Sequence, residues 1–297
     1  MEALLGNPLF LPFAGLVAAA LVIDLTVAGR RRSDPVPTRT ALGFTALWIV
    51  CAVVFGYLIR VTPGVHPGES IGTDEGLVTY LTGYLVEYTL SIDNVFAFTL
   101  VFAALNTPKE ARHRALAWGI VLSIVMRLGM ILLGASLVER FEAVLYLFGA
   151  LLVVTAWRMA RSGGDEGGNS RVASALARRL RLPPTRLAIL VLSVVDLIFA
   201  VDSIPAIFGI TKDPFIVLTS TTFAMCGLRS LYFLLADAKE RFHYLSYGVA
   251  LVLGVIGVKM LLPIVGVHVD PIESLAIVVA IIAVSIGASI LRPAPRS

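Results

Sequence analysis

Long apolar stretches separated by short polar segments recur along the whole chain. Nine of them have the length of about 20 residues that a helix needs to cross the hydrocarbon core of a bilayer. They lie near residues 10–28, 41–59, 77–105, 115–138, 143–160, 187–209, 215–235, 245–263 and 274–291. This pattern predicts an all-α, polytopic bundle of nine transmembrane helices. The stretch at 77–105 exceeds the bilayer thickness, so it is either tilted or divided into two half-helices.

The composition excludes a soluble protein. Of the 297 residues, 58% are hydrophobic and 15% charged, and the mean hydropathy is +0.89. A soluble domain carries about 25% charged residues. Cys51 and Cys226 fall inside apolar stretches, which is typical of small core residues and not of a disulfide framework or a thiolate site. We therefore expect one integral membrane domain over residues 1–297, in contact with membrane lipids and without a nucleic-acid partner.

Basic residues concentrate in alternate connections between the stretches. Eighteen Lys and Arg follow the first, third, fifth, seventh and ninth stretches, whereas the other connections hold only Arg60, Arg140 and Lys212. Because such an excess marks the cytoplasmic side, the N-terminus is predicted outside and the C-terminus inside a bacterial inner (plasma) membrane. The connection 161–186 is predicted as a basic cytoplasmic loop, either a solvated connector or an interfacial segment on anionic lipid.

Eight ionisable residues lie inside the apolar stretches, where each costs about 2.5–3.5 kcal/mol unless it is paired or hydrated. They are Asp24, Glu87, Asp93, Arg127, Asp196, Asp202, Arg229 and Lys259. Pairing every base would still leave two of the five acids unmatched, and Lys259 is near enough to the end of its stretch to extend to the interface. The surplus predicts bound protons or a bound cation of charge about +2. The alternative is that acids and bases pair only to hold helices together.

The acidic motif occurs twice. Each copy has an acid, a second acid six residues later and then a small polar residue: Glu87, Asp93 and Asn94 in VEYTLSIDNVFAF, and Asp196, Asp202 and Ser203 in VDLIFAVDSIPAIF. The next stretch of each copy contains one arginine, Arg127 or Arg229. Because an odd number of spans separates the copies, two inverted three-helix units are predicted at 77–160 and 187–263, as in secondary transporters. Helices at 10–59 precede these units and the helix 274–291 follows them.

Helical geometry separates the two acids of each motif. Six residues turn an ideal helix by about 600°, so these acids point about 120° apart. Glu87, Ser91 and Asn94 share a face instead. Either the helices unwind near Asp93 and Asp202, or the two acids of each motif serve different faces. Pro205 either frees a carbonyl oxygen as a cation ligand or produces a packing kink only.

The candidate ligands are all oxygen atoms. Carboxylates, an amide, hydroxyls and carbonyls favour Mg²⁺, Ca²⁺ or Mn²⁺ over Cu(I) or Zn²⁺. The four histidines are expected in loops and form no ligand-spaced cluster: His66, His113, His243 and His268. The residues alone therefore favour a hard divalent cation without choosing among the three.

The motifs closely resemble the TerC family of integral membrane proteins, including its Alx-type members. The matching segments are LVIDLTV around Asp24, GYLVEYTLSIDNVFAF (83–98), HRALAWGIVLSIVMRLGMILLG (113–134), DLIFAVDSIPAIFGIT (196–211), FAMCGLRSLYF (223–233) and GVIGVKMLL (254–262). The resemblance implies a role in Mn²⁺ efflux and expression that responds to pH or metal. It carries over Glu87, Asp93, Asn94, Asp196, Asp202 and Ser203 as site residues, and Asp24, Arg127, Arg229 and Lys259 at weaker family positions.

The leading interpretation is an exporter of a divalent metal, most of all Mn²⁺, with Ca²⁺ and Mg²⁺ left open. Asp93 and Asp202 are assigned as ligands, and Glu87 and Asp196 as ligands or proton carriers. Arg127 and the second arginine would pair with the acids in the empty state. Because metal binding requires deprotonated ligands, coupling to protons is expected. No bound cofactor is expected.

Three other functions are weighed against this interpretation. A scaffold for the assembly or insertion of other membrane proteins is the alternative, because organellar relatives are associated with that role. An intramembrane enzyme is not expected, since the GxGD segment and the Asp–x–x–Asp–Gly pattern are both absent. The family name refers to tellurite resistance, but surplus carboxylates repel an oxyanion at low dielectric, so tellurite resistance would be an indirect phenotype.

Overall fold

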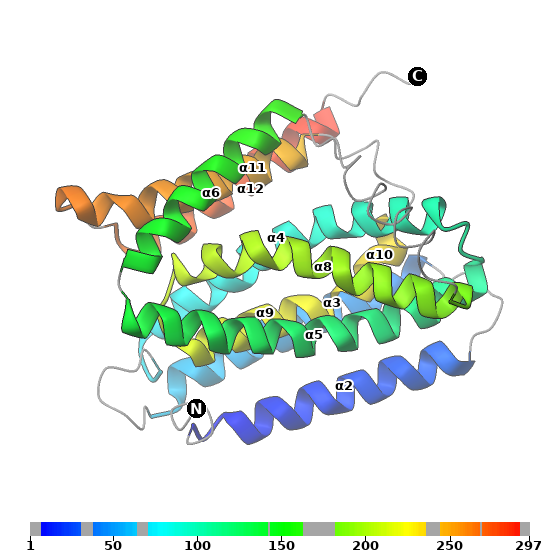
Figure 1. The fold of residues 1–297 in the computed structure, drawn as a ribbon. Coiled ribbons are helices and arrows are strands. Elements are labelled where there is room, and N and C mark those ends of the chain that lie inside the picture. The colour runs from blue at the N-terminus through cyan, green and yellow to red at the C-terminus, as the bar shows by residue number, and fades with distance from the viewer. Residues whose placement is uncertain are drawn as a thin grey trace.

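The computed structural model describes residues 7–30, 38–63, 71–141, 143–162, 182–235, 244–267 and 269–291. Throughout these residues the secondary structure is helical, without a β-strand (Figure 1). The helices are α2 (Phe10–Arg30), α3 (Thr38–Val61), α4 (Asp74–Ala104), α5 (Lys109–Arg140), α6 (Ala143–Ser162), α8 (Pro184–Phe208), α9 (Pro214–Cys226), α10 (Leu228–Leu235), α11 (Leu245–Leu261), the short 3₁₀ helix η2 (Leu262–Val265) and α12 (Pro271–Leu291). The predicted all-α fold class is confirmed.

The helices coincide with the predicted apolar stretches. Among the described residues, eight spans are long and apolar enough to cross a membrane, and α2 adds a further apolar helix of 21 residues. The predicted stretch 215–235 consists of α9 and α10, which meet at Gly227 and together form one span. The protein is therefore an integral membrane protein that crosses the bilayer several times.

Both helices that carry the acidic motifs are continuous. The long stretch 77–105 is one helix of 31 residues, α4, and not two half-helices. Helix α8 continues through Pro205 and ends at Phe208, one turn later. Of the two alternatives left open above, unwinding at the motifs is therefore wrong, and the two acids of the α8 motif, Asp196 and Asp202, face different neighbours.

Local sequence signals define where these helices begin. Thr73 caps α4 by accepting a hydrogen bond from the Gly76 backbone N–H at 3.0 Å. Asp213 caps α9 by accepting one from the Phe215 backbone N–H at 2.9 Å, and Pro214 takes the first helical position. An oxygen acceptor at the N-cap satisfies an N–H group that lacks a partner in its own helix, and proline needs no such partner. The caps fix the residue at which α4 and α9 each begin.

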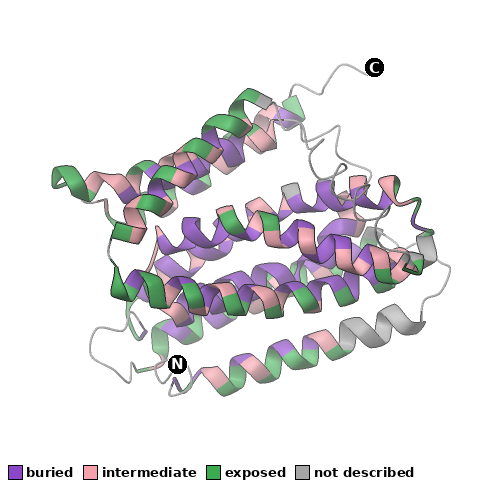
Figure 2. Cartoon of the chain, in the orientation of Figure 1, coloured by how far each residue is buried: buried purple, intermediate pink, exposed green. Residues whose placement is uncertain are grey.

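The central span of the bundle is the one formed by α9 and α10. The most apolar segment of this span is entirely buried, whereas the corresponding segments of the other spans are partly exposed. In Figure 2 the buried positions, in purple, gather toward the interior of the bundle. Helix α4 packs against α9, α5 packs against α8, and α6 packs against α11. A two-fold relation between the units α4–α6 and α8–α11 would produce this pairing, but the inverted repeat itself stays a prediction.

Helices α6, α11 and α12 form a separate layer on one side of the bundle (Figure 1). This outer layer contacts the rest of the protein through α12 on α4 and through α6 on α8. Helices α6 and α11 cross at two glycines: a Cβ atom added at Gly257 would lie 2.8 Å from the backbone oxygen of Gly149. Small residues at a helix crossing let two backbones approach closely within a membrane.

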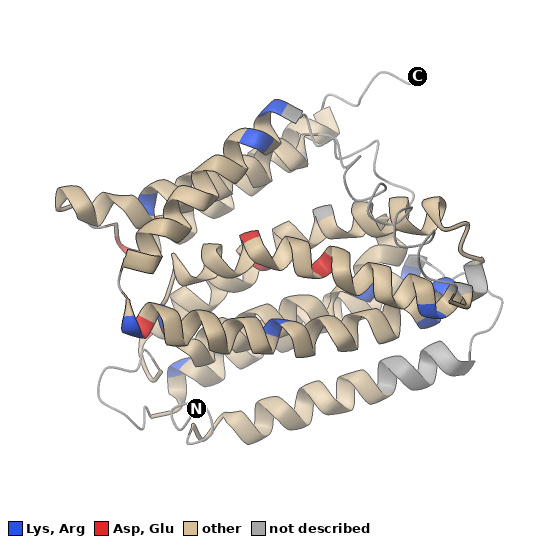
Figure 3. Cartoon of the chain, viewed as in Figure 1, with Lys and Arg blue, Asp and Glu red and all other residues tan. Residues whose placement is uncertain are grey.

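Charged residues are sparse along the helices and more frequent near their ends (Figure 3). Most of the predicted cytoplasmic loop, 163–181, lies outside the described residues. One histidine is not in a loop as predicted, because the first turns of α5 extend the apolar stretch toward the N-terminus. His113 is buried in α5 and stacks on Phe233, with ring centroids 4.4 Å apart.

Candidate functional site

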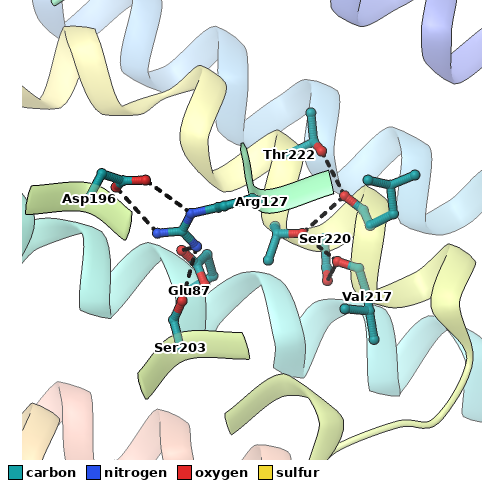
Figure 4. Close-up of polar contacts among 9 residues, drawn as sticks. Glu87, Arg127, Asp196, Ser203, Val217, Ser220 and Thr222 are labelled. Carbon is teal, nitrogen blue, oxygen red and sulfur yellow. Dashed lines mark hydrogen bonds and ion pairs between the residues drawn. The ribbon is translucent and has the colours of Figure 1, made fainter. Parts of the chain in front are cut away.

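One buried guanidinium joins three helices in the bundle interior (Figure 4). Arg127 of α5 donates two hydrogen bonds to Asp196 of α8, from Nε to Oδ2 and from Nη2 to Oδ1, each 3.3 Å long. Its Nη1 donates to Oε1 of Glu87 in α4 and, at 3.0 Å, to Oγ of Ser203 in α8. Four of the five guanidinium N–H donors can thus be satisfied by these contacts. Glu87, Arg127, Asp196 and Ser203 are called the Arg127 network below.

The Arg127 network is shielded from the surroundings of the protein. The exposed fraction is 0% for Glu87, 1% for Asp196 and 2% for Arg127. Each of these three residues lies near the middle of a long helix. A buried charge is tolerated only when it is paired and hydrogen-bonded, and removing one partner leaves the other uncompensated. The network therefore ties α4, α5 and α8 together at their centres.

Two carboxylates share the single guanidinium of this network. With both acids ionised, the network carries one net negative charge. The second oxygen of Glu87, Oε2, is also buried and has no hydrogen-bond partner. Intramembrane acids that are not fully compensated are typical of ion and proton pathways. The network is therefore suited to bind a cation or a proton.

The second acid of α8 has different surroundings. Asp202 is half-buried and faces α6, where Oγ1 of Thr155 donates to Asp202 Oδ1 at 2.9 Å. The charge of Arg158, further along α6, attracts this carboxylate. Asp202 thus lies at the boundary with the outer layer, while Asp196 lies in the bundle interior. The separation of about 120° expected for six residues of helix accounts for the difference.

The remaining residues predicted in the acidic motifs lie on α4. Ser91 and Asn94 are buried, and both are on the helix face that carries Glu87. Oγ of Ser91 has no hydrogen-bond partner. The side chain of Asp93 lies outside the described part of α4.

The predicted accessory residues other than Arg127 are distributed over three helices. Arg229 is buried in α10. Lys259 of α11 donates from Nζ to Oγ of Ser274 in α12 at 2.7 Å, inside the outer layer. The side chain of Asp24 in α2 is not among those described. The structure thus brings Arg127, but not Lys259, into contact with the motif acids.

The metal-binding capacity of the described residues is limited. No group of three or more His, Cys, Asp or Glu side chains within them lies close enough to hold a metal ion. The Arg127 network supplies two carboxylates and one hydroxyl, which are three of the six predicted ligands. Divalent cations such as Mg²⁺ and Ca²⁺ take six or more oxygen ligands, some of them water. Further oxygen atoms must therefore complete any cation site built on this network.

The sequence did not indicate several polar residues that the structure places next to the predicted site residues. Thr155 and Ser274, the partners of Asp202 and Lys259, had no signal in the sequence because their contacts cross helix interfaces. Tyr80 and Tyr84 lie on the same face of α4 as Glu87, at a spacing of four and three residues. Extending the stripe of Glu87 toward the N-terminus of α4 would have found both tyrosines.

These features define the class: a multi-pass helical membrane protein that encloses a charged network within its bundle. Residues 72–296 match the family model described as "Integral membrane protein TerC family", and the chain belongs to this family. The matched range includes both acidic motifs and the whole Arg127 network. The resemblance inferred from the motifs is thereby confirmed.

Similarity to individual members extends over most of the chain. An uncharacterized membrane protein of Myxococcus xanthus is 36% identical over 98% of this chain and 96% of its own length. A protein of Escherichia coli named as a candidate membrane-bound redox modulator, Alx, is 37% identical over 84% of each chain. The chloroplastic thylakoid membrane protein TERC of Arabidopsis thaliana is 36% identical over 81% of this chain and 66% of its own. Comparison with solved structures found no match.

Proposed function

We propose that this protein is a secondary transporter that exports a divalent metal cation, Mn²⁺, from the cytoplasm across the bacterial inner membrane. The observation that carries the proposal is the pairing of two buried carboxylates, Glu87 and Asp196, with one guanidinium. This arrangement holds net negative charge in the interior of a membrane protein, where it is costly unless it has a use.

Arg127 acts in this proposal as an internal counter-ion. Its guanidinium occupies the position between the two carboxylates when no cargo is bound. An entering cation takes over the contacts to Glu87 and Asp196, with Ser203, Ser91 and water supplying further oxygen ligands. Because the metal requires ionised carboxylates, a proton arriving at the site favours release of the metal. This competition would couple export to inward proton flow.

Asp202 has a separate part in the proposal. It faces α6 and not the Arg127 network, so it cannot bind the same ion as Asp196 in the conformation described. If the bundle and the outer layer move relative to each other during transport, the α6–α8 boundary is where Asp202 changes its surroundings. Asp202 then binds the ion in the other access state or carries the proton.

Metal flux through the purified protein in liposomes tests the proposal. Entry of Mn²⁺, Ca²⁺, Mg²⁺ and Zn²⁺ is followed with a metal-sensitive dye inside the vesicles, with and without a pH gradient. We expect Mn²⁺ flux that depends on the protein and increases with the gradient. Glu87→Gln, Asp196→Asn and Asp93→Asn should each abolish most of this flux.

A matched neutralisation outside the interior provides the control. Asp74→Asn removes a carboxylate that is exposed and pairs with Arg60 between α3 and α4. We expect this variant to transport as the wild type does. Unchanged flux in Glu87→Gln and Asp196→Asn, or the absence of metal flux in the wild type, would contradict the proposal.

A second candidate function is an assembly scaffold for other membrane proteins. Its support is an open cavity of about 780 Å³ between α6, α11 and α12, whose lining is almost entirely apolar. A photo-crosslinking residue at Leu251 in this lining should then capture nascent membrane helices, whereas one at the exposed Val54 of α3 should not. Capture at both positions or at neither would contradict this second function.

A further inference from the structure

Four polar atoms along α4 are buried without a hydrogen-bond partner. They are the hydroxyl groups of Tyr80 and Tyr84, Oε2 of Glu87 and Oγ of Ser91. The exposed fraction is 0% for Tyr80 and 4% for Tyr84. Because an unsatisfied buried polar group costs about 1–3 kcal/mol, four on one helix call for an explanation.

The four residues form a single stripe on α4. Their spacing of four, three and four residues keeps them on one face of the helix. At a rise of about 1.5 Å per residue, the eleven steps from Tyr80 to Ser91 extend about 16 Å along the helix axis. Tyr80 lies six residues, less than two turns, after Asp74, the exposed first residue of α4. The stripe therefore leads from near one end of the helix to the Arg127 network.

The hydroxyl groups of the neighbouring helix α9 are arranged differently. Oγ of Ser220 and Oγ1 of Thr222 donate to carbonyl oxygens of their own helix, at 3.2 and 2.7 Å (Figure 4). Oγ1 of Thr219 does the same at 2.7 Å. Serine and threonine can satisfy themselves in this way because their side chains are short. A tyrosine hydroxyl lies too far from its own backbone to do so. Other unsatisfied buried hydroxyls, such as those of Thr45 and Thr107, also occur, but only on α4 do four unsatisfied polar atoms follow one another along one helix face in the part of the chain that the structure describes.

We propose that the α4 stripe binds a chain of internal water molecules that leads from Tyr80 past Tyr84 to Glu87 and Ser91. Internal water typically makes about three hydrogen bonds to polar groups that would otherwise be unsatisfied. Such water satisfies the two phenol groups, the hydroxyl of Ser91 and the second oxygen of Glu87 at once. The chain connects the charged network with the N-terminal end of α4.

This water chain also provides a route for protons, a role that rests on the transport function proposed above. A proton is taken up by the first water of the chain, and each water or hydroxyl oxygen that accepts a proton releases the one it held to its neighbour. The last transfer places a proton on Oε2 of Glu87. One proton enters and one carboxylate becomes neutral, while the guanidinium of Arg127 contacts this carboxyl group, Asp196 and Ser203.

Hydroxyl-radical footprinting of the full-length protein in lipid nanodiscs tests the water chain independently of transport. Radicals generated by radiolysis of bound water oxidise side chains that contact this water, even where bulk solvent does not reach. Tyr232 of α10 is the matched control, because it is equally buried, with an exposed fraction of 3%. The exposed Tyr57 of α3 gives the upper limit of the oxidation rate.

We expect Tyr80 and Tyr84 to be oxidised several-fold faster than Tyr232 and to incorporate oxygen from labelled water. When labelled water is added only shortly before irradiation, incorporation of the label at Tyr80 and Tyr84 should lag behind that at Tyr57, since internal water exchanges slowly. Oxidation of Tyr80 and Tyr84 at the slow rate of Tyr232 would overturn the proposal. Neither result depends on metal flux, so the water chain and the transport function are tested separately.

Removal of the hydroxyl groups supplies a second measurement. If Tyr80 and Tyr84 are dry, Tyr80→Phe and Tyr84→Phe eliminate an unsatisfied group and should raise the thermal midpoint by a few degrees. If they bind water, both substitutions should leave the midpoint unchanged or lower it. We expect the second outcome, and stabilisation of both variants would overturn the proposal. If the wild type transports metal, Tyr84→Phe should also slow proton-coupled flux without reducing metal binding.

Discussion

Asp196 and Asp202 are the same residue type, six positions apart on one continuous helix, and their surroundings differ completely. Asp196 is fully buried and receives two hydrogen bonds from Arg127 in the bundle interior. Asp202 is half-buried at the boundary with the outer layer and accepts one hydrogen bond, from a neutral threonine. The interior charge is held by an opposite charge in direct contact, whereas Asp202 at the boundary is held by a neutral hydroxyl and by the more distant charge of Arg158.

The difference indicates that Asp202, and not Asp196, is the acid that can exchange its hydrogen-bond partner more easily. The contacts of Asp196 join α8 to Arg127 of α5 and can be replaced only by another cation. The contact between Asp202 and Thr155 joins α8 to α6, and α6 belongs to a layer that packs mainly on itself. The acidic motif of α8 thus contains one acid paired with Arg127 in the bundle interior and one acid at the boundary between the bundle and the outer layer.

The largest effect is expected when the interior charge pairing is broken. Arg127→Met leaves Glu87 and Asp196 buried without a counter-charge, which should destabilise the protein by about 3–5 kcal/mol. The thermal midpoint in detergent, followed by intrinsic fluorescence, measures the loss. The combination with Glu87→Gln and Asp196→Asn should recover part of it, because the stranded charges are then removed.

The exposed pair of Arg60 and Asp74 is the control for this prediction. Exposed ion pairs contribute about 0–1 kcal/mol, so Arg60→Met should have little effect on the midpoint. If Arg127→Met were as stable as Arg60→Met, the interior network would not have the structural role assigned to it.

Neutralising Asp196 alone should have the next largest effect. Asp196→Asn removes one charge-assisted hydrogen bond and weakens the other, and such bonds contribute about 1.5–3 kcal/mol each. Arg127 keeps Glu87 as its counter-charge, so the loss should be smaller than in Arg127→Met. Unfolding by denaturing detergent gives the free-energy difference. A loss equal to that of Arg127→Met would mean that Glu87 alone cannot hold the guanidinium.

The boundary can be disturbed from the opposite side, through the outer layer. Gly257→Ala places a methyl group against the backbone of α6 at the crossing with Gly149, and overpacking of this kind costs about 1–3 kcal/mol. Gly254→Ala, one turn earlier on α11, is the matched control, since its Cβ would meet only Ala156 at an ordinary 3.5 Å. Thermal midpoints of the two variants should therefore differ, and equal midpoints would contradict the close crossing.

The smallest change in stability is expected at the boundary acid itself. Asp202→Asn retains an acceptor for the Thr155 hydroxyl, so the loss should not exceed about 0.5–1.5 kcal/mol, the contribution of one neutral hydrogen bond. In a double-mutant cycle with Thr155→Val, the coupling should be close to the average of about 0.6 kcal/mol for polar contacts in membrane proteins. Destabilisation as large as that of Asp196→Asn would remove the distinction between interior and boundary acid.

Much of the fold was evident in the chain itself. Each apolar stretch became helical, with 215–235 divided into α9 and α10, because a segment of that length and composition can satisfy its backbone hydrogen bonds within a membrane only by helix formation. The caps Thr73 and Asp213 mark helix starts through local hydrogen bonds, and the acidic motifs were sufficient to indicate the family. Even the separation of Asp196 from Asp202 follows from the helical repeat.

Only the tertiary structure decided which charges meet. Counting five acids against three bases suggested a surplus, but it could not show that Arg127 binds two of the acids while Asp202 relies on Thr155. Sequence spacing determines which residues share a face of one helix. The partner across an interface depends on how helices distant in sequence pack, and packing is decided by the shapes of all the side chains between them.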